Sequence, residues 1–446
     1  MDPKTVNLRR VQISPWLDKT GLAALYTYAF ATLLSTAAAT VALWVLVGLY
    51  GIKAPETGFR RAHRLFLPWA VLLAYLLMRT LAAMIHRPEW AAQHVDGLWK
   101  WARLLLFPVV AWWIQGDEKR VRYLLATALA GLLFGTVHVI DLHTLESAWQ
   151  GMRTGFHLRI IAFGLYAGTF VWGLVCFAPE VFLARRFRGL WVTIWVVVLL
   201  FLGQCLFFTQ SRGVFLGFAV TSFLVSIIVF MAGRTQGSLE PLSALKRGLI
   251  AFWALFIAFT VINRPLVEKR WLEEKETLLQ LKTFDFSEPA HGSTGYRAHL
   301  YRFAWEGICE DPLWGAGPAT SKRFIQESGR ETLKAPNWKG QMQWWDHLHS
   351  THLEILFHFG TVGALLWLWL YGSLIFDIHR SWKRGTLSTS LWLFSLASLI
   401  YLFLWALFDF RALHPDWRFF WNFLAGVLAS KPFFQGSAVD RKETRP

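Results

Sequence analysis

Long apolar runs alternate with short polar segments along most of this chain of 446 residues. A run of about 20 apolar residues crosses a bilayer as an α-helix, and lipid leaves the backbone no other way to satisfy its polar groups except a closed barrel. The pattern therefore predicts a bundle of transmembrane helices. The clear spans are 65–86, 96–115, 119–141, 157–178, 188–209, 212–232, 246–264, 351–377, 388–409 and 416–433. The region 21–51 is long enough for one tilted helix or two short ones.

Basic residues between the spans predict the orientation. If the spans alternate, one side carries the clusters at 60–64, 119–122, 185–188, 246–247, 380–384 and 441–442. The positive-inside rule makes this side cytoplasmic. Lys4, Arg9 and Arg10 place the N-terminus there too, which requires two crossings within 21–51. We therefore expect about twelve spans with both termini in the cytoplasm.

The expected fold class is an all-α polytopic membrane protein with one large loop on the outer face. Residues 1–264 form an N-terminal transmembrane bundle of about nine spans. The loop 265–350 follows and contains short helices, after which 351–433 provide three more spans and 434–446 a cytoplasmic tail.

Composition agrees with this interpretation. Hydrophobic residues make up 55% of the chain, and 26 tryptophans suit a protein whose indole rings lie at membrane interfaces. The net charge of +16 is explained largely by cytoplasmic loops, so nucleic acid is not expected as a partner. The outer loop also carries cations, however, and these suggest an anionic ligand.

Two arginines stand out among these outer segments. Arg212 lies between two spans that are joined by almost no loop, at the depth of a lipid phosphate, where a guanidinium can bind phosphate with two hydrogen bonds. Arg297 begins a short helix predicted over 296–309 and shares one face with Tyr301 and Trp305. Arg302 belongs to the same helix. Interfacial snorkelling of Arg212 and simple packing of Tyr301 are the alternatives.

Histidines mark the end of the outer loop. Thr351 and Glu354 resemble a capping box that opens the next span, so His349 lies at the mouth of a helix, near water, where it suits a general base. His347 and His352 are rivals by spacing alone. Other outer candidates are Arg153, Arg159, Asp409 and Arg411. Asp409 could orient a histidine or form an ion pair with Arg411.

No metal or cofactor is expected. The outer loop has no Asp-x-Asp, and the chain has no Cys-x-x-Cys pattern, no P-loop and no Gly-x-Gly-x-x-Gly fingerprint. Phosphate binding by arginine would make a metal unnecessary, and nucleotide-driven transport is disfavoured.

The motifs together resemble the bacterial O-antigen ligase and polymerase superfamily. The resemblance rests on Thr209-Gln-Ser-Arg-Gly213, on Tyr296-Arg297 through Asp311-Pro-Leu-Trp-Gly-Ala-Gly317, and on the segment from His349 to Gly363. It implies that His349 is the catalytic histidine and that Arg212 and Arg297 bind diphosphate. The family's histidine is usually followed by asparagine, whereas this chain has Ser350.

The resemblance further implies a glycosyltransferase of the Gram-negative inner membrane whose active site faces the periplasm. A ligase would take a glycan from undecaprenyl diphosphate and transfer it to lipid A–core oligosaccharide, without metal and with inversion. The alternatives within the superfamily are an O-antigen polymerase and a protein O-oligosaccharyltransferase. From another class, a lipid-linked glycan flippase would bind near the bilayer midplane, where these spans carry few charges. A structural scaffold would not need an arginine–histidine cluster.

Overall fold

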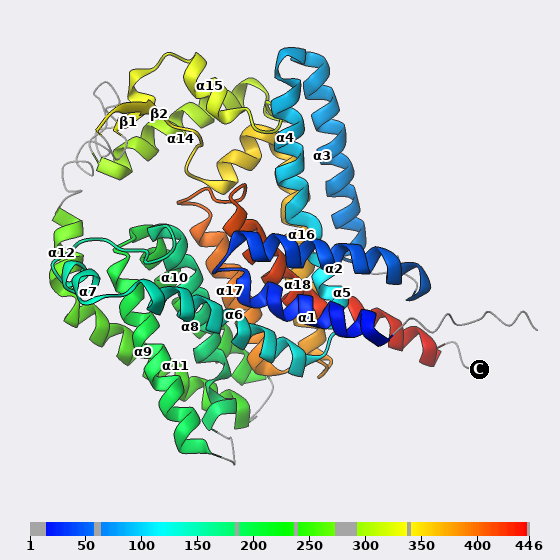
Figure 1. The fold of residues 1–446 in the computed structure, drawn as a ribbon, viewed down its shortest axis with the longest axis vertical. Coiled ribbons are helices and arrows are strands. Elements are labelled where there is room, and N and C mark those ends of the chain that lie inside the picture. Colours follow the sequence, from blue (N-terminus) through cyan, green and yellow to red (C-terminus); the bar gives the residue numbers. More distant parts are fainter. Residues whose placement is uncertain are drawn as a thin grey trace, which may run out of the picture.

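The computed structural model describes residues 15–57, 64–182, 187–235, 240–272, 292–336 and 340–443, and these are almost wholly helical (Figure 1). Seven of the described helices are long and apolar enough to cross a membrane. They are α2 (Thr36–Thr57), α3 (Phe66–His86), α6 (Glu118–Val139), α8 (Ile160–Phe182), α9 (Arg188–Phe208), α10 (Arg212–Thr235) and α16 (Thr351–Lys383). Apolar stretches in α11 (Glu240–Ile262) and α17 (Thr389–Trp405) are shorter, and α18 (Pro415–Glu443) follows. The chain is an integral membrane protein, whereas the number of twelve spans stays a prediction.

The first apolar region forms two helices, as expected, whereas one other expected span has a different form in the structure. Two helices occupy the first apolar region, α1 (Pro15–Ala31) and α2, and they pack against each other. The span expected at 96–115 is not one helix but α4 (Ala91–Ala102), the 3-10 turn η2 (Arg103–Leu106) and α5 (Phe107–Ile114). Pro108 explains the break, because proline in a helix interior has no N–H to donate and its ring clashes with the preceding turn.

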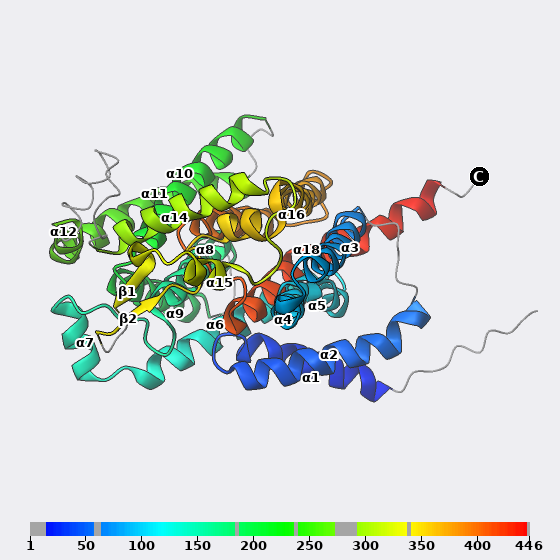
Figure 2. The same ribbon diagram turned by 90° about the horizontal axis from the view of Figure 1, so that it is seen from above.

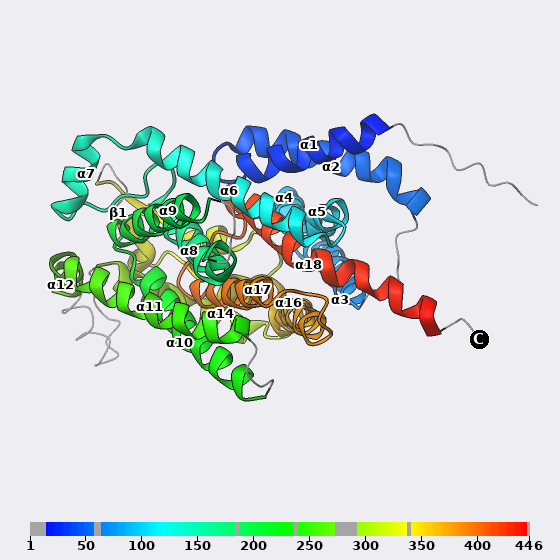
Figure 3. The same cartoon turned by 90° about the horizontal axis from the view of Figure 1, so that it is seen from below.

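Helix α8 forms the centre of one half of the bundle. It contacts α9, α11 and α17, and Figure 3 shows it enclosed among them. Glycine permits the close approach to α17, since a Cβ on Gly168 would lie 2.6 Å from the hydroxyl of Tyr401. The same hydroxyl donates to the carbonyl of Gly164 at 3.1 Å. This packing fixes the helix ends that carry the site.

Most of the outer region lies at one end of the bundle, above it in Figure 1 and nearest the viewer in Figure 2, whereas its first helix lies lower, at the left of Figure 1. It contains α12 (Arg264–Leu272), α14 (Gly292–Glu310), α15 (Ser321–Glu327), η3 (Glu331–Leu333) and the antiparallel strands β1 (Lys334–Pro336) and β2 (Met342–Trp344). The short helix expected at 296–309 is α14, which is longer at both ends. A further short helix, α7 (Leu142–Trp149), was not predicted.

Helix α16 is kinked at Gly360, where φ is 60°. The loop after α14 enters the kink: the N–H of Ala316 donates to the carbonyl of Phe357 at 2.7 Å, and the N–H of Gly317 to that of His358 at 2.9 Å. A Cβ on Gly360 would lie 2.2 Å from the Leu313 carbonyl oxygen, so only glycine fits. The outer loop is therefore locked onto the first turns of α16.

Candidate functional site

A cavity of about 340 Å³ lies where the outer ends of several helices meet. Arg212 enters it from α10, Arg297 from α14 and His349 from the loop before α16. Arg153, from the segment between α7 and α8, also lines it. Four sequence-predicted residues from distant segments are thus brought to one cavity.

Arg212 is the first residue of α10 and follows the buried turn Thr209–Ser211. Gln210 in this turn has φ 47°, which allows the chain to reverse between α9 and α10 without a longer loop. The Arg212 side chain donates through Nη2 to the Ser293 hydroxyl at 2.7 Å. This contact ties the start of α10 to the start of α14, and it places the guanidinium at the mouth of the cavity.

Arg297 and Tyr301 lie one turn apart on α14. The Nε of Arg297 is buried and has no hydrogen-bond partner among the described residues. The Tyr301 hydroxyl donates to the carbonyls of His349, at 3.2 Å, and Leu407, at 2.8 Å, and burial raises its pKa to about 12. Trp305, expected on the same face, is 63% exposed and lines neither this cavity nor the apolar one beside it.

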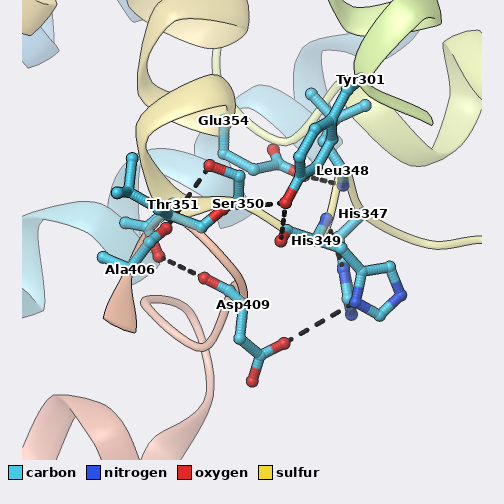
Figure 4. Close-up of polar contacts among 10 residues, drawn as sticks. Tyr301, His347, Leu348, His349, Ser350, Thr351, Glu354, Ala406 and Asp409 are labelled. Atoms are coloured by element: carbon cyan, nitrogen blue, oxygen red, sulfur yellow. Dashed lines mark hydrogen bonds and ion pairs between the residues drawn. The ribbon is translucent and has the colours of Figure 1, made fainter. Parts of the chain in front are cut away.

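His349 faces Asp409 across the loop that follows α17 (Figure 4). Its Nδ1 lies 3.7 Å from the Asp409 Oδ1, an ion-pair distance slightly longer than a hydrogen bond. The backbone of His349 is left-handed, with φ 54°, and its ring meets the edge of Trp345 with centroids 4.4 Å apart. Both ring nitrogens are buried and have no hydrogen-bond partner among the described residues.

Asp409 is 5% exposed and is held as a carboxylate by its neighbours. Burial alone would raise its pKa, but the positive or partly positive groups of His349, His347 and Arg411 outweigh burial and hold the pKa below its usual value. The alternative ion pair between Asp409 and Arg411 is wrong. Arg411 instead binds both oxygens of Asp416, at 3.0 and 2.8 Å, which leaves Asp409 directed at His349.

The two rival histidines have different surroundings. His347 is half-buried beside His349, with ring centroids 4.2 Å apart, and its Nδ1 accepts from the backbone N–H of His349 at 3.3 Å. Burial, together with the charges of His349, His414 and Arg411, lowers the pKa of His347 to about 3. His352 points to α17, where its Nε2 lies 3.0 Å from the Phe403 carbonyl oxygen. His352 is therefore a packing residue outside the cavity.

The remaining predicted cations divide between the cavity and the surface. Arg153 donates through Nε to the carbonyl of Thr209 at 3.2 Å and lines the cavity. Arg159 does not line it but is near enough to His414 to help lower that residue's pKa. Arg302 pairs with Glu306 at 3.0 Å on the outer face of α14 and is also outside.

The expected capping box at the start of α16 is shifted by one residue. Ser350 is the N-cap, and its hydroxyl accepts from the N–H of Leu353. Glu354 does not cap the helix; its Oε1 accepts from the N–H of Leu348 at 2.6 Å. Sequence reasoning also missed Tyr296, Ser293 and Trp345 as lining residues, because no spacing rule connects them to the two arginines.

A second, apolar cavity of about 760 Å³ adjoins the first. Both cavities share Arg212, Gly213, Arg297 and Phe408. The second is lined mainly by side chains of α10, α11, α12 and α14, among them Phe215, Leu216, Ala219, Phe256, Leu266 and Val267. The two arginines thus stand between the smaller cavity, which contains His349, and the larger apolar groove.

The described residues contain no group of three His, Cys, Asp or Glu side chains placed to hold a metal ion. The cluster of His347, His349 and His414 around Asp409 is instead linked by ring contacts and by the single carboxylate.

Comparison with known proteins bears on the same region. No curated protein matches the chain. The family model described as O-antigen ligase matches residues 195–368, which run from within α9 through α14 to α16 and include Arg212, Arg297 and His349. Over this part of its length the chain is therefore similar to O-antigen ligases, and its apolar helices make it an integral membrane protein.

Proposed function

We propose that this protein is an O-antigen ligase that transfers a glycan from undecaprenyl diphosphate to lipid A–core oligosaccharide on the periplasmic face of the inner membrane. One observation carries the proposal: Arg212, Arg297 and His349 share one cavity, and the two arginines also border an apolar groove. That arrangement suits a donor with an apolar tail, a diphosphate and a sugar, in that order.

The diphosphate would lie against Arg212 and Arg297, with Arg153 as a third cation. Guanidinium groups stay charged and bind phosphate oxygens in pairs. The Nε of Arg297 is buried and has no hydrogen-bond partner in the described part of the chain, so it can donate to an oxygen of the ligand at this position. As the bond between the anomeric carbon and the phosphate oxygen breaks, these cations would stabilise the negative charge that grows on the leaving group. The reaction then needs neither a metal nor a nucleotide.

The apolar groove would hold the isoprenoid tail of the donor. Its lining is mainly aromatic and aliphatic, and such a lining buries hydrocarbon well. Because α10 is long and apolar enough to cross a membrane and α11 has a shorter apolar stretch, a lipid tail could enter the groove from the bilayer. The cavity beyond the arginines, which contains His349, would then receive the sugar.

His349 would remove the proton of the acceptor hydroxyl as its oxygen attacks the anomeric carbon from the side opposite the diphosphate. The proton goes to the imidazole, the undecaprenyl diphosphate leaves with the bonding electron pair, and the anomeric configuration is inverted. Asp409 would orient the ring through Nδ1 and stabilise the imidazolium that forms. His347 is a poorer base, because its pKa of about 3 leaves it little affinity for a proton.

The test is a reconstitution in detergent with a chelator of divalent metals. Purified protein is mixed with undecaprenyl-diphosphate glycan and lipid A–core, beside His349→Ala at equal concentration. Glycan transfer to lipid A–core that disappears in the variant supports the ligase. Chain growth on the lipid carrier in place of transfer indicates the polymerase, and transfer only to a protein hydroxyl indicates the O-oligosaccharyltransferase. Movement of the donor across vesicles without any bond breaking would indicate a flippase.

A further inference from the structure

A buried carboxylate lies directly behind the loop that carries His349. Glu354 has 0% exposure, and both of its oxygens are occupied. Its Oε1 accepts from the backbone N–H of Leu348 at 2.6 Å (Figure 4), and its Oε2 accepts from the hydroxyl of Ser321 at 2.5 Å. His358 completes the group: its Nε2 lies 2.7 Å from the Ser321 oxygen and 3.2 Å from Oε2 of Glu354.

The partner of Glu354 is unusual for a glutamate in the first turn of a helix. The helix end is already capped by Ser350, and the Leu348 N–H lies two residues before that cap. Glu354 therefore fixes the loop and not the helix. Burying a carboxylate is costly unless it is hydrogen-bonded, and the Leu348 N–H and the Ser321 hydroxyl supply the hydrogen bonds that Glu354 needs.

The contact between Glu354 and the Leu348 N–H is one of several that hold the backbone around His349. His349 has φ 54°, a left-handed conformation that residues with a side chain rarely adopt. Such a conformation persists only when several surrounding contacts hold it in place. The chain is held before His349, where Glu354 binds the Leu348 N–H, and at His349 itself, where Tyr301 donates to its carbonyl at 3.2 Å.

The other side of the carboxylate is anchored to the membrane helices. Ser321 begins α15, directly after a loop whose carbonyls are bound from α3 and α4. Arg79 donates through Nε to the Trp314 carbonyl at 2.8 Å, and the Nδ1 of His94 lies 3.0 Å from the Pro318 carbonyl oxygen. These contacts connect Glu354, through Ser321, to the helices α3 and α4 of the bundle.

We infer that Glu354 is a positioning residue, which holds His349 in its productive orientation by binding the Leu348 amide on one side and Ser321 on the other. This inference rests on the proposed function for its catalytic consequence. The geometric part of the inference is independent of the proposed function, since Glu354 would hold the His349 loop whatever reaction occurs in the cavity.

The test compares Glu354→Ala with Glu354→Gln. Glutamine keeps an oxygen for the Leu348 N–H and presents an N–H to Ser321, whose hydroxyl can turn to donate to His358. We expect glutamine to retain activity within a fewfold. Alanine should lower kcat by about 100-fold, the size of effect that a displacement of about 1 Å produces. The donor KM should stay within about twofold, because the hydrogen bonds of the Glu354 side chain go to Leu348 and Ser321 and not to Arg212 or Arg297.

Tyr75→Phe is the matched control. It removes another buried hydrogen bond to α16, from the Tyr75 hydroxyl to the Phe359 carbonyl at 2.6 Å, but does not touch the loop. Equal losses of kcat in Tyr75→Phe and Glu354→Ala would show a general loss of stability and overturn the inference. A raised donor KM with unchanged kcat in Glu354→Ala would overturn it as well.

A second readout needs no substrate. Diethyl pyrocarbonate modifies accessible imidazoles, and mass spectrometry reports the rate at His349. We expect faster modification in Glu354→Ala than in the wild type, Glu354→Gln or Tyr75→Phe. An unchanged rate contradicts the positioning role even if activity falls. A wild-type protein that transfers no glycan, while this rate still rises in Glu354→Ala, would instead reject the proposed function and leave the positioning role standing.

Discussion

The Nδ1 of His349 lies 3.7 Å from the Oδ1 of Asp409, although the two residues stand at the ends of different membrane helices. Arg411, the cation nearest to Asp409 in sequence, is occupied by Asp416. The carboxylate is therefore left to serve the imidazole. This relationship makes His349, among the histidines of the outer loop, the one equipped to accept and hold a proton.

Replacement of Asp409 by asparagine should lower kcat at least tenfold. The amide keeps the size of the side chain but loses the charge that stabilises an imidazolium. A double variant with His349→Ala provides the check: if the two residues act as a unit, the double variant loses no more activity than His349→Ala alone. Additive losses would separate Asp409 from the histidine.

His349→Ala should reduce glycan transfer by about 10²- to 10⁴-fold, the usual contribution of a general base. The measurement is the initial rate with saturating donor. His352→Ala is the matched control, because that ring packs on Phe403 and α17, outside the cavity. Comparable losses in both variants would point to a packing role for both histidines.

Arg297→Lys should lower kcat/KM for the donor tenfold or more, since an ammonium keeps the charge but not the planar two-bond grip on a phosphate. Arg302→Lys, on the same helix but paired with Glu306 outside the cavity, should be close to wild type. Full activity in Arg297→Lys would argue against bidentate binding.

A larger side chain in the apolar groove should weaken binding of the donor. Ala219→Trp places an indole among the lining side chains of α10 and should raise the donor KM at least tenfold. Leu224→Trp, on the same helix but outside the lining, is the control. A short-chain donor distinguishes the causes, because the loss in Ala219→Trp should shrink as the isoprenoid is shortened. An equal loss with every chain length would place the tail elsewhere.

His347 should make the protein less stable in acid. Its pKa is lowered to about 3 in the folded protein, against an ordinary value near 6.5 when unfolded. The unfolded chain therefore binds the extra proton, and the contribution of this residue falls as pH drops below about 6.5, by at most about 1.4 kcal/mol per pH unit, until about pH 3.

The check is the apparent Tm in detergent at pH 7 and pH 5. His347→Asn keeps an acceptor for the His349 N–H but cannot take up a proton in this range. The fall in Tm between the two pH values should be smaller in His347→Asn than in the wild type. Equal falls in Tm in the two proteins would show that His347 does not cause the loss of stability in acid.

The sequence by itself determined the elements that depend on local pattern. Apolar runs of bilayer length became α3, α6, α8, α9, α10 and α16 at nearly the expected residues. The polar break before Arg212 and the capping residues before α16 placed two site residues at helix starts, since hydrophobic length and N-caps act over a few neighbouring residues. One prediction from local pattern was wrong: hydropathy predicted a single helix where Pro108 divides the apolar run.

Only the tertiary structure decided which of the outer residues meet. Spacing could not rank His347, His349 and His352, because their roles depend on what α17 and the loop behind it present: Phe403 to His352, and Asp409 to His349. It could not choose between Arg411 and His349 as the partner of Asp409, nor connect Glu354 with Ser321. These choices follow from the packing of helices far apart in sequence, where burial and charge, and not the order of residues, set the lowest free energy.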